Sequence, residues 1–246
     1  DVYKRQAYAF LSAQRVPGPG GLPVGSAGHM LGFLSGGLDS PVALWKMIRR
    51  GARVSAVHFH NRTVQGSAVL EKLQDICSVL AWSAGKMPLL VVPFEASQRA
   101  IVGCVPPEYR MLVYRRAMFR IGAQLARKER ALGYITGDSL GQVASQTLEN
   151  LRTIHAVADL PVFAPLCGTD KVEIIERARV IGTYDISNRP HEDCCSFLIA
   201  DHPATKSSPD DIAKLEAGLD WDALVEEAVD KTKTEVLRPD PELLGV

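Results

Sequence analysis

Residues 35–40 combine the groups that a phosphate ligand needs, in the order Ser-Gly-Gly-Leu-Asp-Ser. An apolar run at 30–34 predicts a buried strand before them, and helical apolar spacing follows at 40–50. Glycines let the backbone approach a phosphate without a Cβ clash, and a helix start directs free N–H groups at an anion. Ser35 and Ser40 would add hydroxyl donors. The pattern predicts a phosphate-binding loop, and a glycine-rich turn without a ligand is the alternative.

The aspartate inside this loop indicates the kind of phosphate chemistry. The Walker A pattern, in which a lysine follows the glycines, is absent. A carboxylate beside phosphates makes sense where it holds Mg²⁺, because the cation offsets the repulsion. We therefore expect Asp39 to be a metal ligand in a site that grips pyrophosphate as a leaving group while the α-phosphorus is attacked.

Two later segments carry polar groups at predicted helix starts. Residues 137–147 follow a predicted strand and are dense in hydrogen-bonding and small side chains, although an ordinary capped helix is the alternative. Asp170 is a plausible N-cap, and Lys171 lies in the first helical turn, against the preference of the helix dipole. A lysine in that place suggests neutralisation of phosphate charge, with a solvated surface lysine as the alternative.

A third segment contains adjacent cysteines, Cys194 and Cys195, after two acids and before His202. The acids would raise a thiol pKa, and His202 or a nearby cation could reverse that effect. Incidental cysteines are the alternative. An iron–sulfur site with Cys167 is a weaker one, because the spacing is unlike known cluster motifs. No Cys-x-x-Cys pair occurs, which argues against a zinc ribbon.

The composition is ordinary for a soluble globular protein, and the length suits one large α/β domain. The chain has 246 residues, a net charge of zero and 46% hydrophobic residues. No apolar run reaches the roughly 18 residues of a membrane span, and no signal peptide is visible, so we expect a cytoplasmic protein without membrane contact. Zero net charge lowers the expectation of a dedicated nucleic-acid binder, although a local basic patch could suffice.

Strand and helix patterns alternate along the middle of the chain. Strands are predicted at 30–34, 54–59, 89–94, 134–135 and 162–164, and helices at 40–50, 68–82, 108–132, 141–156 and 171–181. The alternation predicts a Rossmann-like, doubly wound parallel α/β sheet, which binds ligands at the carboxyl ends of its strands. We expect an N-terminal linker at 1–28, the main domain at 29–209 and a helical C-terminal extension at 210–246.

Together these segments resemble the ThiI family of tRNA 4-thiouridine synthetases (tRNA sulfurtransferases), which belongs to the PP-loop ATP-pyrophosphatase superfamily. The resemblance covers roughly residues 16–209. It rests on Pro-Gly-Gly-Leu-Pro-Val-Gly before the first strand, the loop with its following Pro-Val-Ala, Tyr-Arg-Arg-Ala-Met at 114–118, the 137–147 segment, Asp-Lys at 170–171 and Glu-Asp-Cys-Cys at 192–195.

The resemblance implies that ATP adenylates O4 of the uridine at position 8 of tRNA, and that persulfide sulfur from a cysteine desulfurase displaces AMP. It implies ATP and Mg²⁺ as cofactors and assigns catalytic roles to Asp39, Lys171, Cys194 and Cys195. The implied nucleotide-binding residues are Phe33, Leu34, Ser35, Gly36, Gly37, Ser40, His58, Phe59, Arg115, Gly137 and Gln146. Either cysteine could carry the sulfur, and a homodimer stays open.

Family members carry a ferredoxin-like and THUMP region that grips tRNA, and some carry a rhodanese domain. This sequence matches neither, so we expect a truncated chain. A PP-loop ATP-binding protein without tRNA activity and a small-molecule adenylating synthetase are the alternatives. The basic residues at positions 110, 115, 116, 120, 127, 128 and 130 could meet RNA phosphates or form a solvated helix face.

Overall fold

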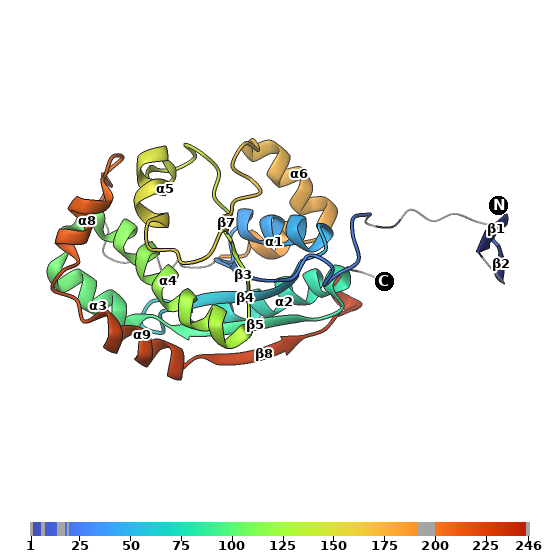
Figure 1. Cartoon of the computed structure of the whole chain (residues 1–246), viewed down its shortest axis with the longest axis horizontal. Helices are drawn as coiled ribbons and strands as arrows, with labels where there is room; N and C mark the ends of the chain where they lie inside the picture. The colour runs from blue at the N-terminus through green and yellow to red at the C-terminus, as the bar shows by residue number, and fades with distance from the viewer. Residues whose placement is uncertain (1, 6–7, 14–17, 19, 191–199, 245–246) are drawn as a thin grey trace.

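A six-stranded sheet forms the centre of the protein in the computed structural model, which describes residues 2–5, 8–13, 18, 20–190 and 200–244. The strands lie in the order β7-β6-β3-β4-β5-β8 (Figure 1). Their bounds are β3 (His29–Phe33), β4 (Arg53–His60), β5 (Met87–Pro93), β6 (Tyr134–Ile135), β7 (Val162–Phe163) and β8 (Lys233–Leu237). All neighbouring pairs are parallel except β5 and β8. The predicted fold class is confirmed.

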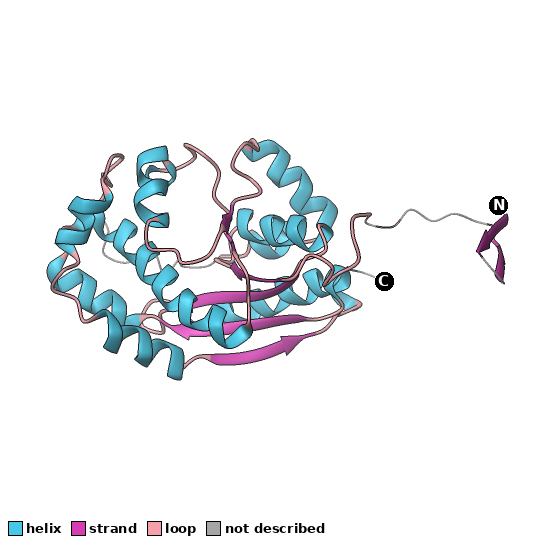
Figure 2. Ribbon diagram, in the orientation of Figure 1, coloured by secondary structure: helices cyan, strands magenta, loops and turns pink. Residues whose placement is uncertain are grey.

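The two central strands are buried almost throughout, as expected of a parallel sheet that is covered on both faces. One face is covered by α1 (Asp39–Arg49), α2 (Ser67–Ala84), α6 (Lys171–Ile181) and α7 (Tyr184–Ser187). Leu44, Ile76 and Ile174 are fully buried in the core of that side. Helices and strands can be followed by colour in Figure 2.

The opposite face has its own core, which contains Tyr114, Phe119 and Ile212. Its helices are α3 (Glu95–Cys104), α4 (Pro107–Glu129), α5 (Leu148–His155), α8 (Pro209–Leu215) and α9 (Trp221–Asp230). The chain switches direction across the sheet between β3 and β6, because β4 follows on one side of β3 and β6 lies on the other. A crevice at such a switch point is where open α/β sheets bind ligands.

The structure departs from the predicted elements in three places. The sequence predicts one helix over 141–156, whereas residues 140–143 form a turn and a bend, η1 (Ala144–Gln146) is a 3₁₀ turn and α5 begins only at Leu148. The helix α3 was not predicted. The predicted C-terminal extension is helical in α8 and α9, but Lys233–Leu237 is a strand that joins the main sheet, followed by η3 (Glu242–Leu244).

Near the N-terminus, β1 (Val2–Arg5) and β2 (Tyr8–Leu11) form a separate antiparallel pair. The glycine- and proline-rich segment before β3 is tied to the end of α1. The N–H of Leu22 donates to the carbonyl of Arg49 at 2.9 Å, and Gly21 adopts φ +100°. A Cβ at position 21 would lie 2.1 Å from the Arg49 oxygen, so only glycine fits. No helix in the described residues is long and apolar enough to cross a membrane.

Candidate functional site

A cavity of about 460 Å³ opens at the carboxyl ends of β3, β4 and β6. Nine of the eleven residues that the resemblance assigns to nucleotide binding line this cavity. The cavity lining includes Phe33, Leu34, Ser35, Ser40, His58, Phe59, Arg115, Gly137, Gln146 and Asp39. Gly36 and Gly37 belong to the same loop but do not line the cavity. Segments more than 100 residues apart in sequence therefore converge on one site.

The loop between β3 and α1 is held by its two serines. The N–H of Ser35 donates to Oγ of Ser40 at 3.1 Å, and the two hydroxyl oxygens lie 3.2 Å apart. Gly36 adopts φ +85°, in the left-handed region that glycine favours. The helix begins at Asp39, and its N-cap Leu38 has no side-chain capping bond, so the first N–H groups are not capped by that side chain.

Gly137 allows β6 to approach this loop closely. A Cβ at position 137 would lie 2.9 Å from the backbone nitrogen of Ser40 and 3.2 Å from the carbonyl carbon of Asp39. Because these are backbone atoms, any larger residue would push the start of α1 away from the end of β6. The glycine thus fixes the distance between the loop and the opposite wall of the cavity.

Asp39 and Lys171 meet at the mouth of the cavity. Nζ of Lys171 donates to Oδ1 of Asp39 at 2.6 Å, and Nε2 of Gln142 donates to Oδ2 at 2.9 Å. The Lys171 side chain is 44% exposed, so the ion pair is open to solvent. Lys46 holds the preceding turn through the carbonyl of Pro165 at 3.2 Å. Asp170 occupies the N-cap position of α6 without a side-chain capping bond.

The wall opposite the loop is organised around Asp138, which the sequence reasoning did not single out. Its Oδ2 accepts from Nη2 of Arg115 at 2.7 Å, and its Oδ1 accepts from Nε2 of Gln146 at 3.2 Å. Burial by itself raises the pKa of Asp138, but the Arg115 guanidinium, a hydrogen bond from Thr136 and the charge of His155 together hold the pKa below the usual value. Burial lowers the pKa of His155, whose Nε2 lies 3.9 Å from Oδ2 of Asp138.

The signal that could have found Asp138 is its place in the chain. It is an acid three residues beyond the end of a predicted strand, at the edge where open α/β sheets bind ligands. Apolar rings form the floor nearby. Phe33 packs on Phe59 with ring centroids 5.6 Å apart, and Nδ1 of His58 donates to the carbonyl of Leu34 at 2.8 Å.

Cys194 and Cys195 lie outside the described residues. The described flanks of their segment both reach the site. Oγ of Ser187 donates to the carbonyl of Gly37 at 3.4 Å on one side, and Pro203 lines the cavity on the other. Of the remaining cysteines, Cys77 is buried and Cys167 is exposed. Burial raises the pKa of the Cys77 thiol well above its ordinary value.

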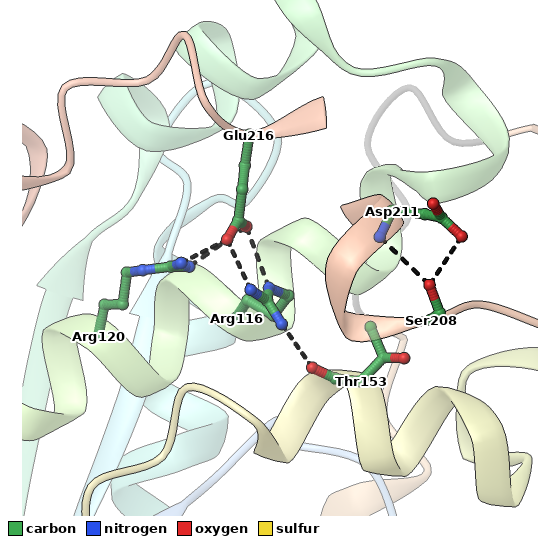
Figure 3. Close-up of polar contacts among 6 residues, drawn as sticks. All are labelled: Arg116, Arg120, Thr153, Ser208, Asp211 and Glu216. Carbon is green, nitrogen blue, oxygen red and sulfur yellow. Dashed lines mark hydrogen bonds and ion pairs between the residues drawn. The ribbon is translucent and has the colours of Figure 1, made fainter. Parts of the chain in front are cut away.

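The basic residues of α4 do not form one free face. Figure 3 shows Arg116 and Arg120 both directed at Glu216, and Nη2 of Arg116 lies 2.6 Å from Oε1 of that carboxylate. Four of the other five basic residues in the cluster also have partners. Arg110 donates to the carbonyl of Val105, Arg115 pairs with Asp138, Arg127 with Asp159 and Lys128 with Asp230. Most of this cluster therefore serves internal contacts.

A family model described as thiamine biosynthesis protein (ThiI) matches residues 25–221. The chain is 46% identical over 238 residues to a probable tRNA sulfurtransferase of Moorella thermoacetica, a match that covers 97% of this chain and 60% of that protein. It is also 46% identical over 217 residues to a probable tRNA sulfurtransferase of Thermus thermophilus, covering 88% and 53%. The chain thus spans 60% and 53% of the length of these relatives.

Among solved structures, a 4-thiouridine synthetase in complex with RNA and with bound ATP superposes with a TM-score of 0.85 at 43% identity. The match covers 89% of this chain and 57% of that one. An NMN synthetase of Francisella tularensis has a TM-score of 0.52 at 12% identity, covering 82% and 84%, which shows a shared fold alone.

The parallel sheet and the Ser-Gly-Gly-x-Asp-Ser loop at its switch point define the class, an α/β protein of the PP-loop ATP-pyrophosphatase superfamily. The family-model match over residues 25–221 then identifies the family within this superfamily. The chain belongs to the ThiI family.

Proposed function

We propose that this chain carries the ATP-dependent adenylation centre of a tRNA sulfurtransferase that makes 4-thiouridine at position 8. The observation that carries the proposal is the single cavity that joins the 35–40 loop to Phe33, Phe59 and Arg115, with Asp39 and Lys171 at its mouth. The similarity to an RNA-bound and ATP-bound 4-thiouridine synthetase supports it.

The proposed reaction proceeds in three displacements. Uridine O4 attacks the α-phosphorus of ATP, pyrophosphate leaves, and O4 becomes part of an AMP leaving group. The terminal sulfur of a persulfide then attacks C4, and AMP departs with the original oxygen. A second thiol cleaves the resulting S–S bond, which releases 4-thiouridine and leaves a disulfide. The persulfide donor would be a cysteine desulfurase, and Cys194 or Cys195 would deliver or release the sulfur.

The residues of the loop would bind the leaving pyrophosphate. The backbone N–H groups at the start of α1, with Ser35 and Ser40, are placed to donate to phosphate oxygens. In the structure Asp39 and Lys171 form an ion pair with each other. On nucleotide binding Lys171 would turn to the phosphates, where its charge would stabilise the negative charge that develops during adenylation.

The residues around Asp39 fit Mg²⁺ that is held mainly by a nucleotide. Mg²⁺ in phosphate sites takes one or two carboxylates together with substrate phosphates. Asp39 supplies one carboxylate at the loop, and the described residues include no group of three acidic, histidine or cysteine side chains that would hold a metal alone. Asp39 would therefore hold the ion, and bound Mg²⁺ would offset phosphate charge.

The deciding experiment is 4-thiouridine formation on unmodified tRNA by this chain, with ATP, Mg²⁺ and a cysteine desulfurase with cysteine as sulfur donor. Nucleoside chromatography would detect the product, and AMP release would be followed in parallel. A supplied RNA-binding region would be tested as a second arm. AMP release that requires tRNA supports the proposal.

Two other outcomes would contradict it. AMP release that ignores tRNA but responds to an amine acceptor would indicate a small-molecule synthetase. ATP binding without AMP release in either arm would indicate a nucleotide-binding protein without tRNA activity. Single Cys194→Ser and Cys195→Ser variants would separate the two thiols, since loss of 4-thiouridine with retained AMP release assigns the sulfur step to that cysteine.

A further inference from the structure

The side chains of Arg115 and Gln146 reach the cavity from different elements, α4 and η1. Both side chains donate hydrogen bonds to the same residue, Asp138. Asp138 uses one carboxylate oxygen for each, Oδ2 for Arg115 at 2.7 Å and Oδ1 for Gln146 at 3.2 Å. The amide carbonyl of Gln146 has no hydrogen-bond partner among the described residues. The orientation of this amide therefore depends on Asp138.

Because Asp138 is a carboxylate, it determines the orientation of the Gln146 side-chain amide. An ionised carboxylate only accepts hydrogen bonds, so Gln146 must present its NH₂ group to Asp138 and keep its carbonyl on the other side. The Asp138 side chain is only 5% exposed, which protects both contacts from water. The backbone of Asp138 is equally constrained, because Gly137 before it is packed on Ser40.

We propose that Asp138 is the positioning residue of the nucleotide pocket, which holds Arg115 and Gln146 in the geometry that binds ATP without contacting ATP itself. This inference rests on the proposed function, since it takes ATP as the ligand. Arg115 is neutralised by Asp138, so its contribution is directional hydrogen bonding in a fixed orientation more than added positive charge. Pre-orienting both side chains removes the cost of ordering them when the nucleotide binds.

The test is ATP affinity measured by calorimetric titration of the whole chain. Asp138→Asn is nearly isosteric and removes the charge, and we expect ATP to bind about tenfold or more weakly, as for loss of a charge-assisted hydrogen bond. The matched control is Asp159→Asn. Asp159 also accepts from an arginine and a second donor, Arg127 at 3.3 Å and the hydroxyl of Tyr134 at 2.6 Å, but it does not line the cavity. We expect its ATP affinity to stay within about twofold of the unmodified chain.

A cycle of variants distinguishes positioning from direct contact. If Asp138 acts only through its two partners, Asp138→Asn adds no further loss to an Arg115→Met, Gln146→Ala background. In AMP release, the KM for ATP should rise while kcat at saturating ATP changes little. A purely structural role would lower the fraction of folded protein, seen by circular dichroism, and leave the ATP affinity of that fraction unchanged.

The outcomes separate the two proposals. ATP binding by the unmodified chain together with unchanged affinity in Asp138→Asn overturns the positioning role and leaves the proposed function intact. Further loss in the triple variant also overturns it, because Asp138 would then contact the nucleotide itself. Failure of the unmodified chain to bind ATP at all overturns both. If Asp138→Asn does not fold, the double and triple variants decide, since Arg115→Met removes the charge that would be left unpaired.

Discussion

Asn150 lies beneath the cavity wall and donates from Nδ2 to the carbonyl oxygen of Ala204 at 2.9 Å, although the two residues are 54 positions apart. The same amide group donates to the carbonyl of Ala144 at 2.7 Å, and Oδ1 accepts from the hydroxyl of Ser207 at 2.7 Å. Asn150 is completely buried. It therefore joins the wall segment before α5 to the segment that contains Pro203, and both polar atoms of its side chain make hydrogen bonds.

We expect Asn150→Asp to loosen this wall, because a carboxylate would face two carbonyl oxygens where an amide now donates. The predicted loss is about 2–4 kcal/mol of stability, as for a buried charge deprived of donors, with weaker ATP binding. Urea unfolding and ATP titration would measure both. Ser207→Ala is the graded comparison, since it removes one hydrogen bond and should cost about 1 kcal/mol. Equal losses of stability and of ATP affinity in the two variants would contradict the inference that Asn150 joins these two segments.

The Asp39–Lys171 pair predicts a separation of activity from stability. The pair is solvent-exposed on the lysine side, so Lys171→Ala should change stability by no more than about 1 kcal/mol. AMP release should fall by about 100-fold or more in both variants, because Lys171→Ala removes a positive charge from the phosphates and Asp39→Ala removes the carboxylate proposed to hold Mg²⁺. Melting curves and AMP assays of the same preparations test this. Full activity in Asp39→Ala would refute the phosphate-loop argument.

Gly137→Ala tests the close approach of β6 to the loop. The new methyl group would meet backbone atoms of Ser40 and Asp39, so the start of α1 has to shift. We expect a loss of about 1–3 kcal/mol in stability, as for overpacking, together with weaker nucleotide binding. Gly168→Ala is the matched control, because a Cβ there has nothing within 4 Å. If the two alanine variants had similar stability and nucleotide affinity, the close contact between residue 137 and the start of α1 would not be needed for either property.

Glu216 should make stability depend on acidic pH. Burial by itself raises the pKa of Glu216, but the hydrogen bonds and the positive charges of Arg116 and Arg120 together lower the pKa below its ordinary 4.5. A depressed carboxyl pKa contributes stability that is complete above the unfolded-state value and is lost as the pH falls toward the folded-state value. Glu216→Gln should therefore cost about 3–5 kcal/mol near neutral pH, since two arginines lose their partner, and the difference should shrink below about pH 4.5.

Urea unfolding of both proteins at pH 7 and pH 4 measures this difference. Glu227→Gln serves as the control, because Glu227 pairs with Lys231 one turn away on the exposed side of α9 and should contribute at most about 0.5 kcal/mol. A pH-independent cost of Glu216→Gln would show that packing, for instance of Arg120 on the Trp221 ring at 4.1 Å, outweighs the charge.

The position of the 35–40 loop between a strand and a helix could be predicted, because phosphate-binding loops use backbone groups at a recognisable strand–helix junction. The contact between Asp39 and Lys171 was not predicted, although the family resemblance implied a catalytic role for each, since no local pattern relates residues 132 positions apart. Asp138 was missed because its importance lies in its two partners. Each of them comes from a different element, and only the folded chain reveals their common anchor.

Errors in the fold prediction have similar causes. The predicted helix start at 141 was wrong. Gly141 adopts φ +74°, and the N–H of Leu140 beside it donates to the carbonyl of Cys167, so tertiary contacts rather than helical spacing determine the conformation here. The strand Lys233–Leu237 has an exposed or half-buried side chain at every position, so it lacks the alternation that indicates a strand. Its structure comes from pairing with β5, a contact that no short window contains.

That pairing has a consequence for biosynthesis. β5 leaves the ribosome long before its antiparallel neighbour, since Met87 pairs with Leu237. At about 5–20 residues per second, the hydrogen-bonding edge of β5 stays uncovered for on the order of ten seconds in each nascent chain. An open edge strand is a template for pairing with other chains. The nascent protein thus passes through an interval in which a chaperone, or crowding on a polysome, would decide between folding and aggregation.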